Sequence, residues 1–421
     1  MAKGKIFPID QSYISLNLKY IAVVGAWNPY EAGIKYQLYQ IYILFYNYGI
    51  FPVKCIADLL QSLHARTLPE FTQGFASVIV HTAGGFKTFS IVYNHPEILL
   101  LARLFNWERH MACTPQMAYF RDVLMTKAAS SLRTITAVIA GVVLLNSISD
   151  LYSTLTVDNC TITDYPLSYL PLKILSSPDN CRSVAVVDYL CHNFASANII
   201  IIDNFLMAVM TYITVQLKIL NFRLKNCHKT FVEELIIPEE ERNFKITEYE
   251  CCRMSKGQLT LKPNEELIKC IENHQKMREI FKTFELIYSN ILLPQLFSSL
   301  MILSLMGCQL VLTKYDTDEE VHDMVHPLVF VIWGTMELYI YCAGGNNILV
   351  ESENISSSAY NTEWYNNDKE FRENLSIFLA LVKKPLGLHI GGVVSLSKDT
   401  FKNILTKAYS FMAILKNSTD Q

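Results

Sequence analysis

The sequence predicts an all-α membrane protein with seven transmembrane helices, a cytosolic N-terminus and an extracellular C-terminus. Three observations carry this prediction: a surplus of apolar residues, their grouping into long uncharged stretches, and the charges between those stretches. Hydrophobic residues make up 51% of the chain and charged residues 18%, whereas soluble proteins average about 25% charged residues. The positive mean hydropathy of +0.21 points the same way.

The clearest transmembrane signal is the stretch 286–313, which contains no charged residue. A bilayer core requires about 20 apolar residues in a helix. The alternative, a buried helix of a large soluble enzyme, rarely needs so long an uncharged run. The remaining spans are interrupted more often and are expected near 36–57, 72–93, 130–153, 184–217, 325–349 and 373–416, the last one broken in its middle.

Several of these spans contain a charged residue. Charge within a membrane is costly, so we expect it to face the interior of the helix bundle or a water-filled cavity. The residues concerned are Lys87, Arg133, Asp188, Asp203 and Glu337. For Arg133 and Asp188 the simpler interpretation is a place near the end of a span.

The charges of the connecting segments orient the chain. Residues 1–35 lack the apolar stretch of a signal peptide and are expected to stay in the cytosol. The connectors 94–129 and 218–285 then lie inside and hold 17 of the 36 lysines and arginines, whereas 314–324, with one lysine and five acids, lies outside. This agrees with the positive-inside tendency. The orientation is opposite to that of a G-protein-coupled receptor.

Cysteines and glycosylation sequons offer a test of this orientation. The eleven cysteines form no CxxC pair and no Cys/His cluster at zinc spacing, so neither a metal nor a cofactor is expected. Cys160 and Cys181 share an outer connector, where a disulfide is permitted; the sequence leaves open whether they are bridged or free. Asn159 begins a sequon on the same side, whereas the sequons at Asn354 and Asn374 are expected to lie inside or at the membrane.

The long inner loop 218–285 ends in an amphipathic pattern. From Leu267 to Ile287 apolar residues recur every three or four positions, which predicts a helix that runs straight into the uncharged span. Such helical cytosolic extensions would form an inter-subunit packing domain. The chain therefore divides into a cytosolic segment 1–35, transmembrane helices one to six over 36–349, and a region 350–421 that holds an inner loop and a split seventh helix.

Motifs of catalysis are missing from the sequence. It contains no GxGxxG, P-loop, HExxH or GxSxG motif. His81, His192, His274 and His326 each stand without a partner at ligand spacing, which is typical of structural histidines. We therefore expect neither enzyme activity nor a nucleic-acid partner.

The last third of the chain carries a series of short motifs. They are His274-Gln275, Tyr288-Ser289, Cys308-Gln309-Leu310, Tyr341-Cys342 with Gly345-Asn346, Ala359-Tyr360, Trp364-Tyr365, Pro385-Leu386, Gly391-Gly392, Ser395-Leu396, Thr400-Phe401 and Tyr409-Ser410. Each pair alone is weakly specific. In this order and spacing they make the chain resemble the insect odorant receptors, a seven-helix family of inverted topology.

The resemblance implies an odorant-gated, non-selective cation channel with four subunits around one pore, in the plasma membrane of a sensory-neuron dendrite. The implied partners are shared odorant coreceptor subunits in a tetramer, a small volatile odorant and membrane lipid. The coreceptor has a longer second inner loop, which favours an odour-tuning subunit here. The alternatives are a gustatory-type ligand-gated channel, a G-protein-coupled receptor with an extracellular N-terminus, and a transporter or membrane enzyme.

The polar stretch 394–417 is the expected pore-lining half of the seventh helix. On a helical wheel its apolar residues share one broad face and its polar residues the opposite one. Ile414 is the large apolar residue in the polar stripe, where four copies would form a constriction that gates by dewetting. The alternative is an amphipathic helix lying flat on the membrane. The predicted pore and gate residues are Asn403, Lys407, Ser410, Ile414 and Asn417, although a lysine is unexpected on a cation pathway.

The resemblance also implies a ligand pocket in the outer half of the bundle, formed by helices two to six. A volatile ligand calls for apolar and aromatic walls with few polar groups. The predicted lining residues, each of which also fits ordinary core packing, are Phe75, Val78, Ile79, Ser147, Tyr152, Phe194, Ile199, Phe330 and Trp333. Glu337 stands where the family often has a glutamine, which leaves two roles open: tuning of ligand choice, or a hydrogen bond within the bundle.

Overall fold

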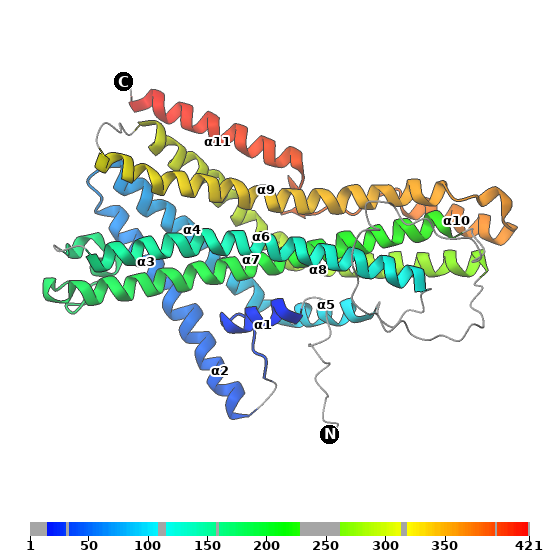
Figure 1. The fold of residues 1–421 in the computed structure, drawn as a ribbon, viewed down its shortest axis with the longest axis horizontal. Helices are drawn as coiled ribbons and strands as arrows, with labels where there is room; N and C mark the ends of the chain where they lie inside the picture. The colour runs from blue at the N-terminus through cyan, green and yellow to red at the C-terminus, as the bar shows by residue number, and fades with distance from the viewer. Residues whose placement is uncertain are drawn as a thin grey trace.

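The structure is a computed structural model that describes residues 15–30, 33–107, 115–156, 160–227, 262–312, 318–391 and 394–419. Long helices lie side by side and form one elongated bundle (Figure 1). The helices are α1 Ser15–Val23, α2 Ile34–Leu44, α3 Phe51–Leu63, α4 Leu68–Tyr93, α5 His95–Trp107, α6 Pro115–Thr156, α7 Cys181–Asn226, α8 Pro263–Leu312, α9 Asp318–Tyr360, α10 Lys369–Leu381 and α11 Lys398–Thr419. A π-helical stretch, Phe45–Ile50, joins α2 to α3.

The predicted all-α membrane fold is confirmed. In the described part of the chain, six helical stretches are long and apolar enough to cross a bilayer: Ile34–Leu63, Pro69–Tyr93, Phe120–Gly141, Cys181–Asn226, Pro263–Val311 and Met324–Asn366. The predicted seventh span consists of α10 and α11, which are separated by a hairpin of two short strands, β1 His389–Ile390 and β2 Val394–Ser395. Helix α11 is not among the six because the face that it turns away from the bundle is polar.

Helix α7 occupies the centre of the bundle. It packs against α4, α6, α8 and α9, and side chains around its circumference, such as Phe205, Ala208 and Met210, are buried. A helix that is apolar on all sides must be surrounded by other helices. Helices α8 and α9 each contain a proline in their interior, Pro294 and Pro327.

The amphipathic pattern after Pro263 forms the first turns of α8, as expected. Its apolar residues are buried, among them Leu267, Ile280 and Phe284, and α10 packs against this part of the bundle. An ion pair of 2.6 Å between Arg223 Nη2 and Glu266 Oε1 ties the end of α7 to the start of α8. The long helices thus continue into a packed region at one end of the bundle.

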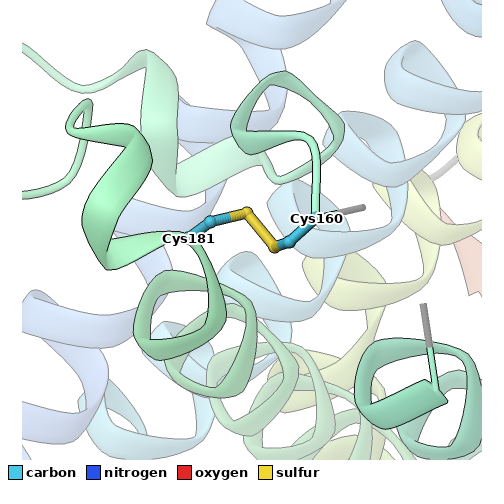
Figure 2. The surroundings of a disulfide bond; sticks show 2 residues. All are labelled: Cys160 and Cys181. Atoms are coloured by element: carbon cyan, nitrogen blue, oxygen red, sulfur yellow. A yellow bond between two sulfur atoms is a disulfide. The ribbon is translucent and has the colours of Figure 1, made fainter. Parts of the chain in front are cut away.

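A disulfide closes the loop at the opposite end (Figure 2). It joins Cys160 to Cys181, the first residue of α7, with the two Cα atoms 6.1 Å apart. The intervening loop holds a short helical turn, Pro166–Tyr169, that packs on α3. The predicted glycosylation site Asn159 lies outside the described residues.

Candidate functional site

A cavity of about 100 Å³ lies between α4, α6, α7, α8 and α9, in the half of the bundle that carries the disulfide. Its wall is mostly apolar and includes Ile199, Ile302, Phe330 and Trp333. An engineered apolar cavity of about 150 Å³ in another protein binds benzene. The cavity therefore suits a small organic molecule with few heavy atoms, and we call it the ligand cavity.

The structure brings four of the predicted lining residues to the ligand cavity: Ser147, Ile199, Phe330 and Trp333. The other predicted residues lie elsewhere. Phe75 and Ile79 do not line the cavity but pack against an adjoining apolar cluster of α4 and α8 that shares Ile302 with the cavity wall, and Val78 is not part of the wall either. Phe194 is 49% exposed and contacts the ring of Tyr46. Tyr152 belongs to α6, but its side chain lies outside the described residues.

These misplacements share a physical reason. Phe194 and Ile199 are both apolar residues of α7 and differ by five positions, which turns their side chains to different faces of the helix. Phe194 therefore points away from the cavity and Ile199 points into it. The sequence alone does not say which apolar face of a membrane helix meets lipid and which meets another helix.

The prediction missed the two histidines of the cavity wall, His81 and His192. Their rings lie edge to face, with 5.4 Å between the centroids, and His81 Nδ1 is 2.7 Å from Asp58 Oδ2. The two histidines come from α4 and α7, and Asp58 comes from α3. No spacing rule within one helix could reveal partners on three helices; the hydrogen bond of His81 to Asp58 is that of a structural histidine, as expected.

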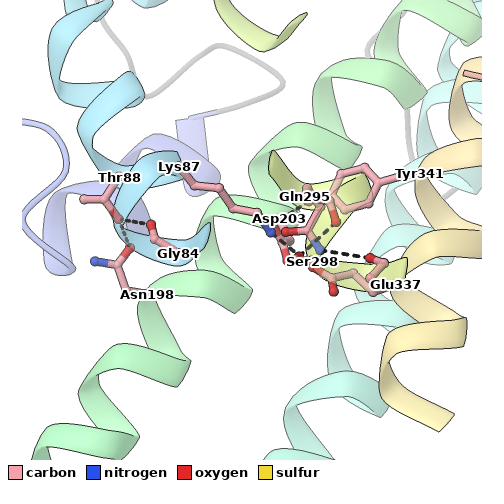
Figure 3. A network of polar contacts seen from close by, with 10 residues as sticks. Gly84, Lys87, Thr88, Asn198, Asp203, Gln295, Ser298, Glu337 and Tyr341 are labelled. Carbon is pink, nitrogen blue, oxygen red and sulfur yellow. Dashed lines mark hydrogen bonds and ion pairs between the residues drawn. The ribbon is translucent and has the colours of Figure 1, made fainter. Parts of the chain in front are cut away.

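A polar network lies at the inner edge of the ligand cavity (Figure 3). Lys87 Nζ is 2.6 Å from Asp203 Oδ1 and 3.1 Å from Glu337 Oε1, and the Tyr341 hydroxyl donates to Asp203 Oδ1. The network links α4, α7 and α9, and Glu337 also lines the cavity. The expectation that these three charges face the bundle interior is confirmed.

A second cluster of charges lies nearer the disulfide. Lys54 Nζ is 3.1 Å from Asp58 Oδ1 and 3.0 Å from Asp188 Oδ1. These residues line an outer chamber of about 1080 Å³, which shares His192 and Phe330 with the ligand cavity. The outer chamber and the ligand cavity are therefore adjacent.

Helix α11 packs one face on α8 and α9 and leaves the other uncovered. Ala408 on the packed face is 5% exposed, whereas Ile414 is 65% exposed. Three of the remaining predicted pore residues are also exposed: Asn403, Lys407 and Ser410. The side chain of Asn417 lies outside the described residues. Phe411 departs from the predicted division into two faces, because the wheel places this apolar residue on the packed face and it is 41% exposed.

Comparison with known proteins identifies the fold and the family. A family model described as a seven-transmembrane odorant receptor matches residues 67–409, most of the chain. The chain belongs to the insect odorant receptor family. Members of this family are ligand-gated ion channels and not enzymes.

Individual odorant receptors are similar to this one over part of their length. Odorant receptor 49a of Drosophila melanogaster is 23% identical over 155 residues, which are 37% of this chain and 38% of that protein. Odorant receptor 94a of the same species is 26% identical over 144 residues, 34% of this chain and 37% of that protein. The matched part thus spans well under half the length of these relatives.

A solved structure agrees over almost the whole chain. The olfactory receptor OR5 from Machilis hrabei in complex with eugenol superposes with a TM-score of 0.73 and covers 96% of this chain and 99% of its own. The sequence identity is 11%, so the likeness concerns the fold. In this odorant receptor, the surface of the ligand cavity is mostly apolar, and its polar groups include His81 and His192 towards the outer chamber and Glu337 at the inner edge.

Proposed function

We propose that this odorant receptor is an odour-tuning subunit that binds a small volatile molecule in the ligand cavity and opens a cation pore lined by α11. The observation that carries the proposal is the ligand cavity itself, a mostly apolar space bounded by five helices. Such a cavity suits a ligand that is held by burial of apolar surface and oriented by a few polar groups. The Machilis hrabei receptor was solved in complex with eugenol, which supports a small organic ligand here.

The uncovered face of α11 supports its assignment to the pore. A polar helix face at membrane depth is stable only against water or protein. In a tetramer, each copy of this chain would place Lys407 and Ile414 of α11 towards the common axis. Ile414 would then contribute to a ring of side chains that closes the pore by excluding water.

The assembly we propose is a tetramer with shared coreceptor subunits in the plasma membrane of a sensory-neuron dendrite. The subunits would pack through the region formed by α10 and the adjoining ends of α7, α8 and α9. The small odorant would reach the ligand cavity from the outer chamber, which adjoins it at His192 and Phe330. Lipid would surround the remaining helices.

The proposal is tested by co-expression with a coreceptor in cells that lack insect G proteins, followed by recording with a panel of volatiles. We expect an odour-evoked cation current. Ser196→Trp would fill the ligand cavity and abolish the current, whereas Leu190→Trp, on an exposed face of the same helix, would preserve it. A wild-type response that requires a G protein, or no response to any volatile, contradicts the proposal.

The pore assignment has a separate test. Ile414→Ser should raise the basal current or change the ion selectivity, because a polar ring no longer expels water. Leu145→Ser is the control, since Leu145 is similarly exposed at 70% but belongs to α6. If Ile414→Ser matches the wild type in both properties, Ile414 is not in the pore, and the interfacial position of α11 becomes the better account.

The orientation is tested by mapping glycans. Sugar on Asn159 and none on Asn354 is the expected result, because only Asn159 would face the lumen during synthesis. The opposite pattern would reverse the chain in the membrane.

A further inference from the structure

A second apolar space lies on the side of the bundle, between α6 and α9. Both helices pack against α7, but among the described residues they do not pack closely against each other. The gap between them holds a space of about 60 Å³ with an almost entirely apolar surface. We call it the lateral groove; it is bounded by Val138 and Ile139 of α6, Asn204 and Met207 of α7, and Ile332 and Met336 of α9.

The rim of the lateral groove lies at membrane depth. Val138 belongs to the span Phe120–Gly141, and Ile332 and Met336 belong to the span Met324–Asn366. Val138 is 50% exposed, Ile332 51% and Met336 42%. Apolar side chains that a membrane helix leaves uncovered lie against lipid. The lateral groove therefore opens towards the acyl chains of the bilayer.

A thin boundary separates the lateral groove from the ligand cavity. Trp333 and Glu337 line both spaces, and they lie about one helical turn apart on α9. Two side chains of one turn thus form this boundary, and its apolar part is the indole of Trp333. Glu337 is also part of the polar network drawn in Figure 3, which holds it in place. Trp333 is therefore the side chain that decides whether the two spaces are joined.

The polar groups at the floor of the lateral groove are paired with one another. Thr136 Oγ1 donates to Asn204 Oδ1 at 2.6 Å, and Lys87 contacts the carboxylates of Asp203 and Glu337. Polar groups at membrane depth are stable when they pair within the bundle. The floor therefore needs no further hydrogen-bond partner, and a molecule in the groove gains mainly apolar contact.

The outer chamber, which also adjoins the ligand cavity, has the opposite character. Its wall carries charged side chains, among them Lys54, Asp58, Arg66, Glu70 and Asp188. Charged groups of a membrane protein lie against water or a partner, so the outer chamber suits water. The ligand cavity thus has two neighbouring spaces, one suited to water and one open to lipid.

We propose that the lateral groove is a second entrance to the ligand cavity, through which apolar volatiles arrive from the bilayer. Such molecules accumulate in the membrane, because each additional methylene raises their concentration there about fourfold. Trp333 would turn aside to let the molecule pass, a change of side-chain rotamer that needs no movement of the helices. The inference rests on the proposed odorant function and adds a route for the ligand.

The test measures the kinetics of currents evoked by propan-1-ol and butan-1-ol, which differ by one methylene, on the receptor co-expressed with a coreceptor. Entry from lipid predicts an initial current rise about fourfold faster for butan-1-ol than for propan-1-ol at equal, low aqueous concentration. Ile332→Trp and Val138→Trp narrow the groove from opposite rims. Both should remove this ratio and slow the rise and the washout of the butan-1-ol current by the same factor.

The half-maximal concentration should stay unchanged in both variants, because an entrance alters the rates of binding and release but not the bound state. Leu328→Trp is the matched control, since Leu328 is 39% exposed and lies one turn further out on α9. Wild-type rates in both Ile332→Trp and Val138→Trp would overturn the inference and leave the channel function in place. So would a shifted half-maximal concentration at unchanged rates, because the groove would then act on binding and not on entry.

If these alcohols evoke no current, the fluorescence of Trp333 decides. The purified receptor is placed in nanodiscs of phosphatidylcholine with acyl chains brominated near their middle, and the Trp333 signal is the difference between the wild type and Trp333→Phe. Loss of that signal relative to the same lipid without bromine, and its recovery in Val138→Phe, supports the opening to lipid even where the channel function fails. A Trp333 signal equal in both lipids overturns the inference.

Discussion

Replacing Lys87 by methionine should destabilise the receptor strongly, because two buried carboxylates depend on this one ammonium. Lys87 is 1% exposed and its two partners are each 13% exposed, with contacts of 2.6 and 3.1 Å. Removing one partner of a buried ion pair costs roughly 3–5 kcal/mol. The ammonium also lies 5.6 Å from the ring centroid of Tyr341, a cation–π contact of about 1 kcal/mol. We therefore expect Lys87→Met to lower the unfolding free energy by roughly 4–5 kcal/mol, the upper half of that range.

The assay is thermal unfolding of the purified receptor. At about 2 °C per kcal/mol, the midpoint should fall by roughly 8–10 °C. Lys276→Met is the matched control, since Lys276 is 39% exposed and pairs with Glu279 at 2.8 Å, and exposed ion pairs contribute only about 0–1 kcal/mol.

A rescue experiment isolates the cause. Neutralising both carboxylates in Lys87→Met, with Asp203→Asn and Glu337→Gln, should restore most of the stability, because no charge is then left unpaired. A Lys87→Met receptor that melts within about 2 °C of the Lys276→Met control would refute the reasoning. So would a triple variant no more stable than Lys87→Met alone.

Two further changes should alter stability at defined places. Gly345→Ala would put a Cβ 2.6 Å from the backbone oxygen of Leu396, so α9 and the segment before α11 must separate. This should cost about 1–3 kcal/mol of unfolding free energy. Gly141→Ala, whose new Cβ would have nothing within 4 Å, should instead stabilise α6 by about 0.5–1 kcal/mol. Equal melting points would contradict this account. Replacing Cys160 and Cys181 by serine opens a loop of sequence separation 21 and should lower the unfolding free energy by about 3 kcal/mol. Thermal unfolding with and without reductant measures this loss. A wild type that is insensitive to reductant and as stable as the double variant would argue against the bridge.

The sequence predicted the helices well because the relevant energies are large. A run without charge, such as 286–313, has few stable places other than a membrane helix, and its residues 286–312 lie within α8. Charges inside spans were also correctly assigned to the interior for Lys87, Asp203 and Glu337, since each of them would cost several kcal/mol against lipid.

The site was only partly predictable because apolar residues carry no such penalty. A phenylalanine is equally stable against lipid, in the core or at a cavity wall, so Phe194 and Phe330 could not be told apart from the sequence. The polar groups of the wall were missed for another reason. His192 lies against His81 of another helix, and such a partner becomes visible only when the helices are placed side by side.

The prolines within α8 and α9 lie beside the ligand cavity. Pro294 directly precedes Gln295, and Pro327 lies one turn before Val331 and Phe330. Because proline cannot donate the helical hydrogen bond, each helix resists bending least at this level. From Pro263 to Pro294, α8 continues for roughly 45 Å towards the far end of the bundle. A bend of about 3° at the proline would displace that end by roughly 2 Å. A small change of angle beside the cavity therefore moves the far ends of these helices by an ångström or more.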